Sequence, residues 1–157
     1  MNRGSVVREG YIYIAAALFL AVVMYFGFGV AVAVPFVVLA CYFTYFFRNP
    51  DRTIPTDEHL VVSPADGTVQ DVVELEDDDF VKGPCTKIII FLSVFNVHVN
   101  RSPIAGEIKC QKYVCGRFRP AYKDEVGFEN ERHMLGIENE KGFRVTVTQI
   151  AGILARR

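Results

Sequence analysis

The chain opens with a long apolar stretch and then changes to an alternating pattern. Residues 11–47 contain no Asp, Glu, Lys, Arg or His, whereas residues 48–157 hold all three histidines and nearly all the charge. One straight membrane helix needs only about 20 apolar residues, so this run is too long for one. The pattern predicts three parts: an N-terminus (1–10), a membrane-anchoring segment (11–47) and a polar domain (48–157).

Two glycines, Gly27 and Gly29, interrupt the apolar run near its middle. Glycine readily adopts turn conformations. We therefore predict two helices, at about 12–26 and 30–47, that form a transmembrane or re-entrant hairpin. A cleaved signal peptide is a weaker alternative because the run exceeds the usual apolar core. A buried soluble hairpin is also weaker, because a surface helix should show a polar face.

Basic residues flank the apolar run on both sides. Arg3 and Arg8 precede it, and Arg48 and Arg52 follow it. Basic residues beside membrane segments tend to stay in the cytoplasm. We therefore expect both ends of the hairpin on the cytoplasmic side of the cell membrane, with the polar domain on the same side.

The polar domain has the alternation and turn residues of short β-strands. The segments predicted as strands are 68–73, 87–94, 109–114, 132–138 and 143–150. The nearly unbroken apolar run of 87–94 predicts a central strand covered on both faces. The fold class is therefore mainly β, a short-stranded sandwich or a partly open barrel. Because residues 151–157 begin an element without closing it, we expect the domain to be incomplete at its C-terminus.

Composition narrows the function classes. A formal net charge of −1 gives no basic footprint for nucleic acid. The four cysteines and three histidines show no zinc-finger spacing and are too scattered to predict a metal site. Free thiols in a reducing compartment are the simplest interpretation of the cysteines.

Two residues are candidates for catalysis. His98 follows an apolar strand, and its ordinary pKa lets it pass protons in either direction near neutrality. Asp66 lies in a Pro-Ala-Asp-Gly turn and could orient His98 by accepting from one ring nitrogen. A satisfied core histidine and an ordinary turn aspartate are the alternatives that the residues alone leave open.

Arginines could bind phosphate if the substrate is a phospholipid, since the guanidinium fork matches phosphate oxygens. Solvated surface charge is the alternative for each of them. The candidates for substrate binding are Arg48, Arg101, Arg156 and Arg157.

Five motifs in this order resemble the phosphatidylserine decarboxylase family, in its short form of bacteria and archaea, whose archaeal members act on archaetidylserine. They are 46–52 (FFRNPDR), 63–69 (SPADGTV), 91–103 (FLSVFNVHVNRSP), 130–132 (NER), and 149–152 (QIAG) with 155–157 (ARR). The resemblance covers the chain from about residue 10 to its end. Each motif is weak alone, but the ordered set behind a membrane hairpin is specific.

The resemblance implies a pyruvoyl enzyme. In this family a precursor cleaves itself at a Gly-Ser bond, and the serine becomes an N-terminal pyruvoyl group on the α chain. That group forms a Schiff base with the serine amine of the lipid, which then loses CO2. Carried over, His98 and Asp66 activate the serine, and His98 is the candidate donor of the proton that replaces the carboxylate.

The chain departs from the family pattern twice. Asn96 stands where many relatives have an Asp two positions before the histidine. The serines are Ser5, Ser63, Ser93 and Ser102, and none lies in a late Gly-Ser motif. The chain thus resembles most of a β chain without the pyruvoyl-bearing α chain, which would be its partner. Whether it also forms a homo-oligomer is open.

Two function classes remain. The first is a membrane-bound β-chain portion of a pyruvoyl-dependent decarboxylase that forms a phosphatidylethanolamine-type lipid and is inactive without its α segment. The second is a non-catalytic, membrane-anchored β-rich module that binds lipid or a partner protein. A metallohydrolase is disfavoured because no ligand cluster can be assembled.

Overall fold

The computed structural model describes residues 6–55, 57, 60–119 and 129–153. The chain divides into two compact units. The first unit contains residues 1–55 together with 94–99, and the second contains 56–93 together with 100–157. The short segment 94–99 therefore belongs to the unit of the N-terminal helices, although strands surround it in the sequence.

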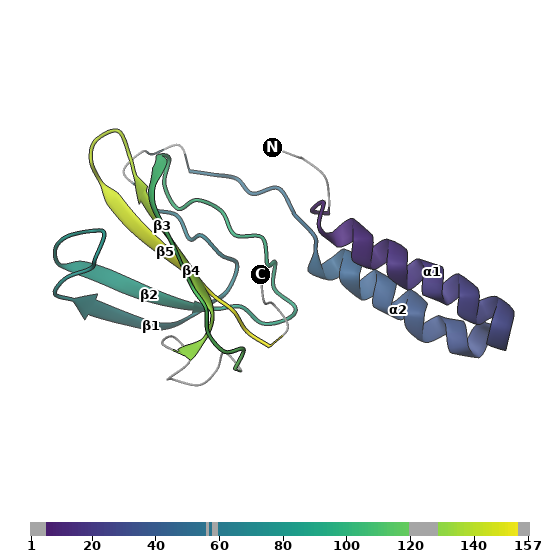
Figure 1. The fold of residues 1–157 in the computed structure, drawn as a ribbon. Helices are drawn as coiled ribbons and strands as arrows, with labels where there is room; N and C mark the ends of the chain where they lie inside the picture. The colour runs from purple at the N-terminus through teal and green to yellow at the C-terminus, as the bar shows by residue number, and fades with distance from the viewer. Residues whose placement is uncertain (1–5, 56, 58–59, 120–128, 154–157) are drawn as a thin grey trace. The chain divides into compact units, whose positions relative to one another are not determined.

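The apolar run folds as the predicted helical hairpin. Helix α1 spans Gly10–Phe28 and helix α2 spans Val30–Phe46, with Gly29 alone between them (Figure 1). Gly29 has a φ of 87°, a backbone conformation that residues with a Cβ rarely adopt. Its N–H donates to the Tyr25 carbonyl at 3.0 Å. The predicted interruption thus becomes a one-residue turn.

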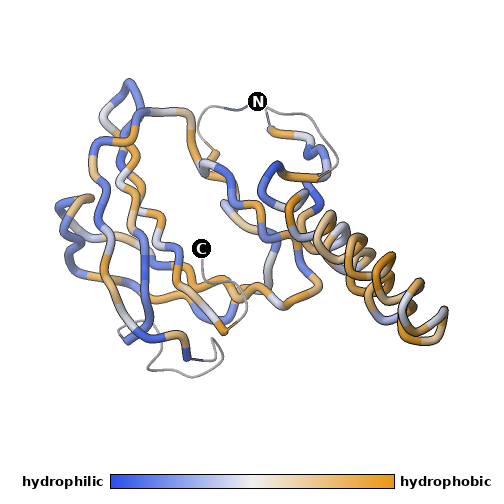
Figure 2. Tube along the Cα trace, turned by 45° about the vertical axis from the view of Figure 1, so that its right-hand side comes forward, coloured by the Kyte–Doolittle hydropathy of each residue, from blue (hydrophilic) through white to orange (hydrophobic). Residues whose placement is uncertain are grey.

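Small side chains lie between the two helices and large apolar ones face outward. The buried positions are Ala17, Ala21, Ala33 and Ala40, whereas Phe26 is 82% exposed. Figure 2 shows apolar character along the length of both helices. Membrane helices pack in this way, through small residues at close approach. By length and composition α1 could cross a membrane, and α2 is a shorter apolar helix.

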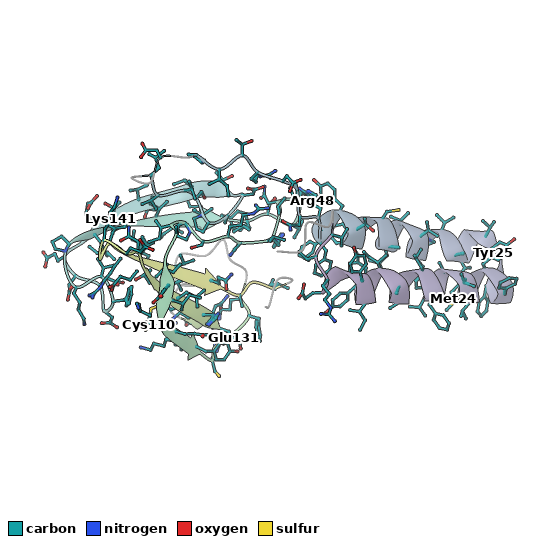
Figure 3. The ribbon with its side chains drawn as sticks, turned by 90° about the horizontal axis from the view of Figure 1, so that it is seen from above. Met24, Tyr25, Arg48, Cys110, Glu131 and Lys141 are labelled. Carbon is teal, nitrogen blue, oxygen red and sulfur yellow. The ribbon has the colours of Figure 1, made fainter. Side chains whose placement is uncertain are left out.

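The two ends of the hairpin are fastened together at its base. The Val7 N–H donates to the Phe47 carbonyl at 2.9 Å, and Val6 forms an antiparallel bridge with Arg48. The ring of Tyr13 stacks on Phe47 with centroids 5.4 Å apart. Arg48 lies at this end, and Met24 and Tyr25 lie at the opposite end (Figure 3). Both flanks of the hairpin therefore emerge at one end.

The second unit is built from two antiparallel sheets. Strands β1 (Thr68–Leu75) and β2 (Cys85–Phe91) form one. Strands β3 (Glu107–Val114), β4 (Arg132–Glu138) and β5 (Arg144–Ile150) form the other, in the order β3-β4-β5. The prediction of a mainly β domain behind a helical hairpin is confirmed.

The prediction that 87–94 forms a central strand is wrong. Among the described residues, β2 pairs with β1 alone, and Ile88 is 57% exposed. An apolar run reports that a strand favours burial, but it cannot reveal which neighbours supply that burial. The strand also ends at Phe91, so 92–94 leave the sheet.

The connection between β1 and β2 docks on the second sheet. The ring of Phe80 lies against Gly136 of β4, where an added Cβ would come within 2.7 Å of that ring. The Thr146 hydroxyl on β5 donates to the Asp78 carboxylate at 3.0 Å. These contacts hold the two sheets of the unit together.

Candidate functional site

His98 lies in the segment 94–99, within the unit of the helical hairpin. Its Nδ1 is 3.0 Å from the carbonyl oxygen of Asn96. Because a carbonyl can only accept, Nδ1 carries the proton in this contact. The other ring nitrogen, Nε2, then has a lone pair, and the neutral ring can act as a base.

The last turn of α2 contacts the imidazole. The ring of Phe46 stacks on His98 with centroids 4.3 Å apart and an interplanar angle of 26°. Burial lowers the pKa of His98 from its ordinary value of 6.5, and the positive charge of Arg48 lowers it further, against the opposing effect of the Asn96 carbonyl. His98 is therefore mainly neutral at pH 7.

Two side chains of the hairpin base hold the backbone before His98. The hydroxyl of Tyr45 donates to the Phe95 carbonyl at 3.1 Å, and Arg48 donates to the same oxygen at 2.8 Å. A second Arg48 nitrogen donates to the Tyr45 carbonyl at 2.8 Å. The guanidinium also lies over the Tyr45 ring, 3.7 Å from its centroid. Arg48 was predicted to bind substrate, and the structure gives it this structural role; phosphate binding stays a prediction.

The turn with Asp66 lies in the second unit and is paired with the segment after His98. The Arg101 N–H donates to the Pro64 carbonyl at 2.9 Å, and the Val62 N–H donates to the Pro103 carbonyl at 3.0 Å. At Gly67 an added Cβ would lie 2.5 Å from the Phe91 carbonyl oxygen, so this position requires glycine. Two of the motifs singled out in the sequence are thus hydrogen-bonded neighbours.

Asp66 and His98 belong to different units. The orienting role of Asp66 therefore stays a prediction. Arg101 is joined to the Pro64 turn through its backbone, and phosphate binding by its side chain is likewise untested. Arg156, Arg157 and His59 lie outside the described residues.

Asn130 is a residue that sequence reasoning missed, because the 130–132 motif did not single it out. It is fully buried, with 0% of its surface exposed. Its amide nitrogen donates to the carbonyls of Arg119 and Ala151 at 2.8 and 2.7 Å, and its Oδ1 accepts from the Arg119 N–H at 3.0 Å. Asn130 thus joins the 117–119 segment to the chain after β5. The signal in the sequence was its place in the 130–132 motif, directly before a predicted strand.

His133 and the cysteines do not contribute to the surroundings of His98 that are described above. His133 on β4 contacts Gln111 on β3, with Nε2 atoms 2.7 Å apart. The cysteines are free thiols, at positions 41, 85, 110 and 115. Within the described ranges, no three His, Cys, Asp or Glu side chains gather as metal ligands do.

His98 thus lies in a segment that is hydrogen-bonded to an apolar helical hairpin, and the chain also contains a β-rich unit. Comparison with known proteins gives the family. The family model for phosphatidylserine decarboxylase matches residues 39–157. The chain therefore belongs to the phosphatidylserine decarboxylase family.

Individual relatives agree over the whole chain. The phosphatidylserine decarboxylase proenzyme of Symbiobacterium thermophilum is 48% identical over 157 residues, which are 100% of this chain and 73% of that protein. The proenzyme of Carboxydothermus hydrogenoformans is 44% identical over 96% of this chain and 70% of its own length. That of Geobacter metallireducens is 43% identical over 97% of this chain and 72% of its length. The chain thus spans roughly seven tenths of these relatives.

Proposed function

We propose that this chain is the membrane-anchored β-chain portion of a pyruvoyl-dependent phosphatidylserine decarboxylase, or of an archaetidylserine decarboxylase. It would form an ethanolamine-type phospholipid and CO2. The observation that supports this proposal best is the contact of His98 Nδ1 with the Asn96 carbonyl oxygen at 3.0 Å, which favours a proton on Nδ1 and a lone pair on Nε2. The relatives' name, proenzyme, agrees with a precursor that must be processed.

The first step assigned to His98 is maturation. Its Nε2 would take the proton from a serine hydroxyl in the α segment of the same precursor, so that the oxygen can attack the preceding carbonyl. Asp66 is the second catalytic candidate, placed there by its motif. The α chain remains the partner of this chain after cleavage.

The second step assigned to His98 is proton return. A pyruvoyl group supplies an electron sink that lets the substrate carboxylate leave as CO2. A neutral base fits such a group, because a charged imidazolium would disfavour the approach of a serine amine in its cationic form. Nε2 of His98 would take the proton that the cationic amine of the substrate loses before it reacts, and would deliver that proton to the carbon that lost the carboxylate. Arg101, with Arg156 and Arg157, is proposed to bind the lipid phosphate.

The hairpin is proposed as the membrane anchor. Its large apolar side chains face outward and its alanines lie between the helices, which suits a lipid environment better than water. Because its two ends are hydrogen-bonded together, both would lie on one side of the membrane, and the flanking arginines favour the cytoplasmic side. A phospholipid could then be processed without leaving the bilayer.

The test uses the chain extended through its native α segment. Intact mass spectrometry should find two peptides, the smaller with a blocked pyruvoyl N-terminus, and the preparation should release CO2 from phosphatidylserine vesicles. His98→Ala should slow both self-cleavage and turnover by at least about a hundredfold. An extended wild-type protein that stays uncleaved would favour the non-catalytic lipid-binding or partner-binding module.

A further inference from the structure

Three side chains at the C-terminal end of α2 contact the segment that carries His98. They are Tyr45, Phe46 and Arg48, which we call the anchor clamp. Tyr45 and Arg48 donate to the Phe95 carbonyl, and Phe46 stacks on the His98 ring. All of these contacts lie within one unit of the chain. The clamp therefore connects a membrane helix directly to the candidate catalytic base.

We propose that the anchor clamp is a positioning device for His98, so that the hairpin is part of the catalytic machinery as well as a tether. This inference deepens the proposed function and rests on it. Tyr45, Phe46 and Arg48 act through His98 and are positioning residues.

The clamp fixes the hydrogen-bond acceptor of His98 through the backbone. Phe95 and Asn96 are adjacent, so only the two backbone dihedrals of Asn96 separate the held Phe95 carbonyl from the peptide unit that carries the Asn96 carbonyl. The Phe95 oxygen accepts from Tyr45 at 3.1 Å and from Arg48 at 2.8 Å. The Asn96 oxygen then accepts from Nδ1 of His98 at 3.0 Å. Two donors on the anchor thus act, through the backbone of residues 95–96, on the tautomer of His98 three residues after Phe95.

The clamp also fixes the plane and the charge of the ring. Phe46 covers one face of the imidazole at 4.3 Å and excludes water from it. The charged group that acts on His98 is Arg48, which disfavours a second positive charge nearby. Val97, between Asn96 and His98, is only 2% exposed, and its burial keeps the segment in place. One face of the ring is therefore fixed against Phe46, and the positive charge of Arg48 disfavours protonation of the ring.

Arg48 suits this task because its guanidinium is a fork. One nitrogen reaches the Tyr45 carbonyl at the end of α2, and another reaches the Phe95 carbonyl, each at 2.8 Å. The lysine ammonium is a single point donor on a flexible stem and cannot reproduce this planar bridge. Arg48→Lys therefore keeps the charge but should lose the positioning.

The first experiment needs no catalytic activity. The chain is labelled with 15N-histidine and placed in phosphatidylcholine nanodiscs, and the ring-nitrogen shifts of His98 are followed against pH, with His98→Gln for assignment. The wild type should show the Nδ1–H tautomer and a pKa below 6.5. Phe46→Leu, Tyr45→Phe and Arg48→Lys should each mix the tautomers and move the pKa toward 6.5.

Phe43→Leu is the matched control. Phe43 stands one turn earlier on α2 and contacts Tyr13 and Tyr42. This variant removes the same aromatic ring from the hairpin base and should leave the His98 titration unchanged. If the clamp variants titrate as Phe43→Leu does, the positioning role is overturned. Tyr45→Phe removes one hydroxyl without changing the packed volume, so it remains informative if Phe46→Leu does not fold.

The second experiment uses the full-length proenzyme with a short-chain, water-soluble phosphatidylserine. Positioning predicts that Tyr45→Phe and Arg48→Lys lower kcat and the self-cleavage rate by about tenfold with little change in KM, since an imprecise base loses part of its contribution. If the hairpin only tethers the enzyme to the membrane, both variants should keep the wild-type kcat with this water-soluble substrate. That result would overturn the inference. If the wild-type proenzyme is inert, the proposed function fails, while the nanodisc titration still decides on the clamp.

Discussion

At the scale of single residues, His98 shows what a sequence can and cannot specify. Its motif and its ordinary pKa were enough to select it. Its tautomer depends on the Asn96 carbonyl and its neutrality depends on Phe46 and Arg48. Phe46 and Arg48 lie about fifty positions away in the chain. No local pattern encodes such contacts, so the residue could be predicted but its surroundings could not.

The lowered pKa of His98 predicts a dependence of stability on pH. Between its folded pKa and 6.5, the unfolded chain binds more protons than the folded chain, so stability falls as the pH is lowered through this range. His98→Gln should reduce that loss, and thermal unfolding in detergent between pH 7.5 and 5 measures it. An identical pH dependence in the variant would show that His98 does not titrate with a depressed pKa.

Asn130 allows a prediction about a buried amide. Asn130→Asp places a second carboxylate oxygen opposite the Arg119 and Ala151 carbonyls in place of a donor. We expect a loss of about 2–4 kcal/mol at pH 7, because buried acceptors are left facing each other. Burial should raise the pKa of the new carboxyl, so the variant should regain stability as the pH falls, unlike Asn130→Ala. Unfolding at pH 7 and pH 5 distinguishes them, and equal losses at both pH values would contradict this role.

At the scale of elements, the docked β1–β2 connection depends on Asp78. Burial raises the pKa of this carboxyl, but hydrogen bonds from the N–H groups of Val81 and Phe80 and from the Thr146 hydroxyl lower it below 3.8 overall. The stabilisation is therefore complete above pH 3.8 and disappears as the pH falls through the folded pKa.

Asp78→Ala and Thr146→Val should each cost at least about 1 kcal/mol at pH 7. The double variant should cost less than the sum, because both changes remove the same hydrogen bond. Thermal unfolding followed by circular dichroism measures the three variants, with the exposed Glu140→Gln as control. Strict additivity would show that the 3.0 Å contact contributes nothing.

The existence of the strands was easier to predict than the way in which they pair. The predicted strand 132–138 coincides with β4, and it forms a hairpin with β5 because Asn139 and Gly142 supply turn chemistry that is visible in the sequence. The position of β2 in a two-stranded sheet was missed. Alternation reports the two faces of a strand, whereas the neighbours along its edges come from distant parts of the chain.

At the scale of the whole molecule, the hairpin predicts a defined membrane topology. Cysteines introduced as Arg8→Cys and Arg52→Cys, in a background without the four native thiols, should react with an impermeant maleimide from the same side. In inverted vesicles both should label, and in intact cells neither should. Labelling of the two sites from opposite sides would contradict a hairpin with fastened ends.

The division into an apolar part and a β-rich part was visible in the sequence. The assignment of residues 94–99 to the unit of the hairpin was not. A segment of six residues carries no periodicity of its own, and its contacts with Tyr45, Phe46 and Arg48 are formed only after the chain has folded. The family motifs selected both partners without indicating that they touch.

The one-residue turn at Gly29 has an electrical consequence. Helices α1 and α2 contain no formally charged side chain, and neither does the turn. The two helix dipoles run in opposite directions and largely cancel. Moving one elementary charge through 100 mV changes its energy by about 2.3 kcal/mol, but the proposed anchor would offer a membrane voltage no net charge to act on. Insertion of this hairpin should therefore proceed equally well into energised and de-energised membranes, and a collapse of the proton-motive force should leave its yield unchanged.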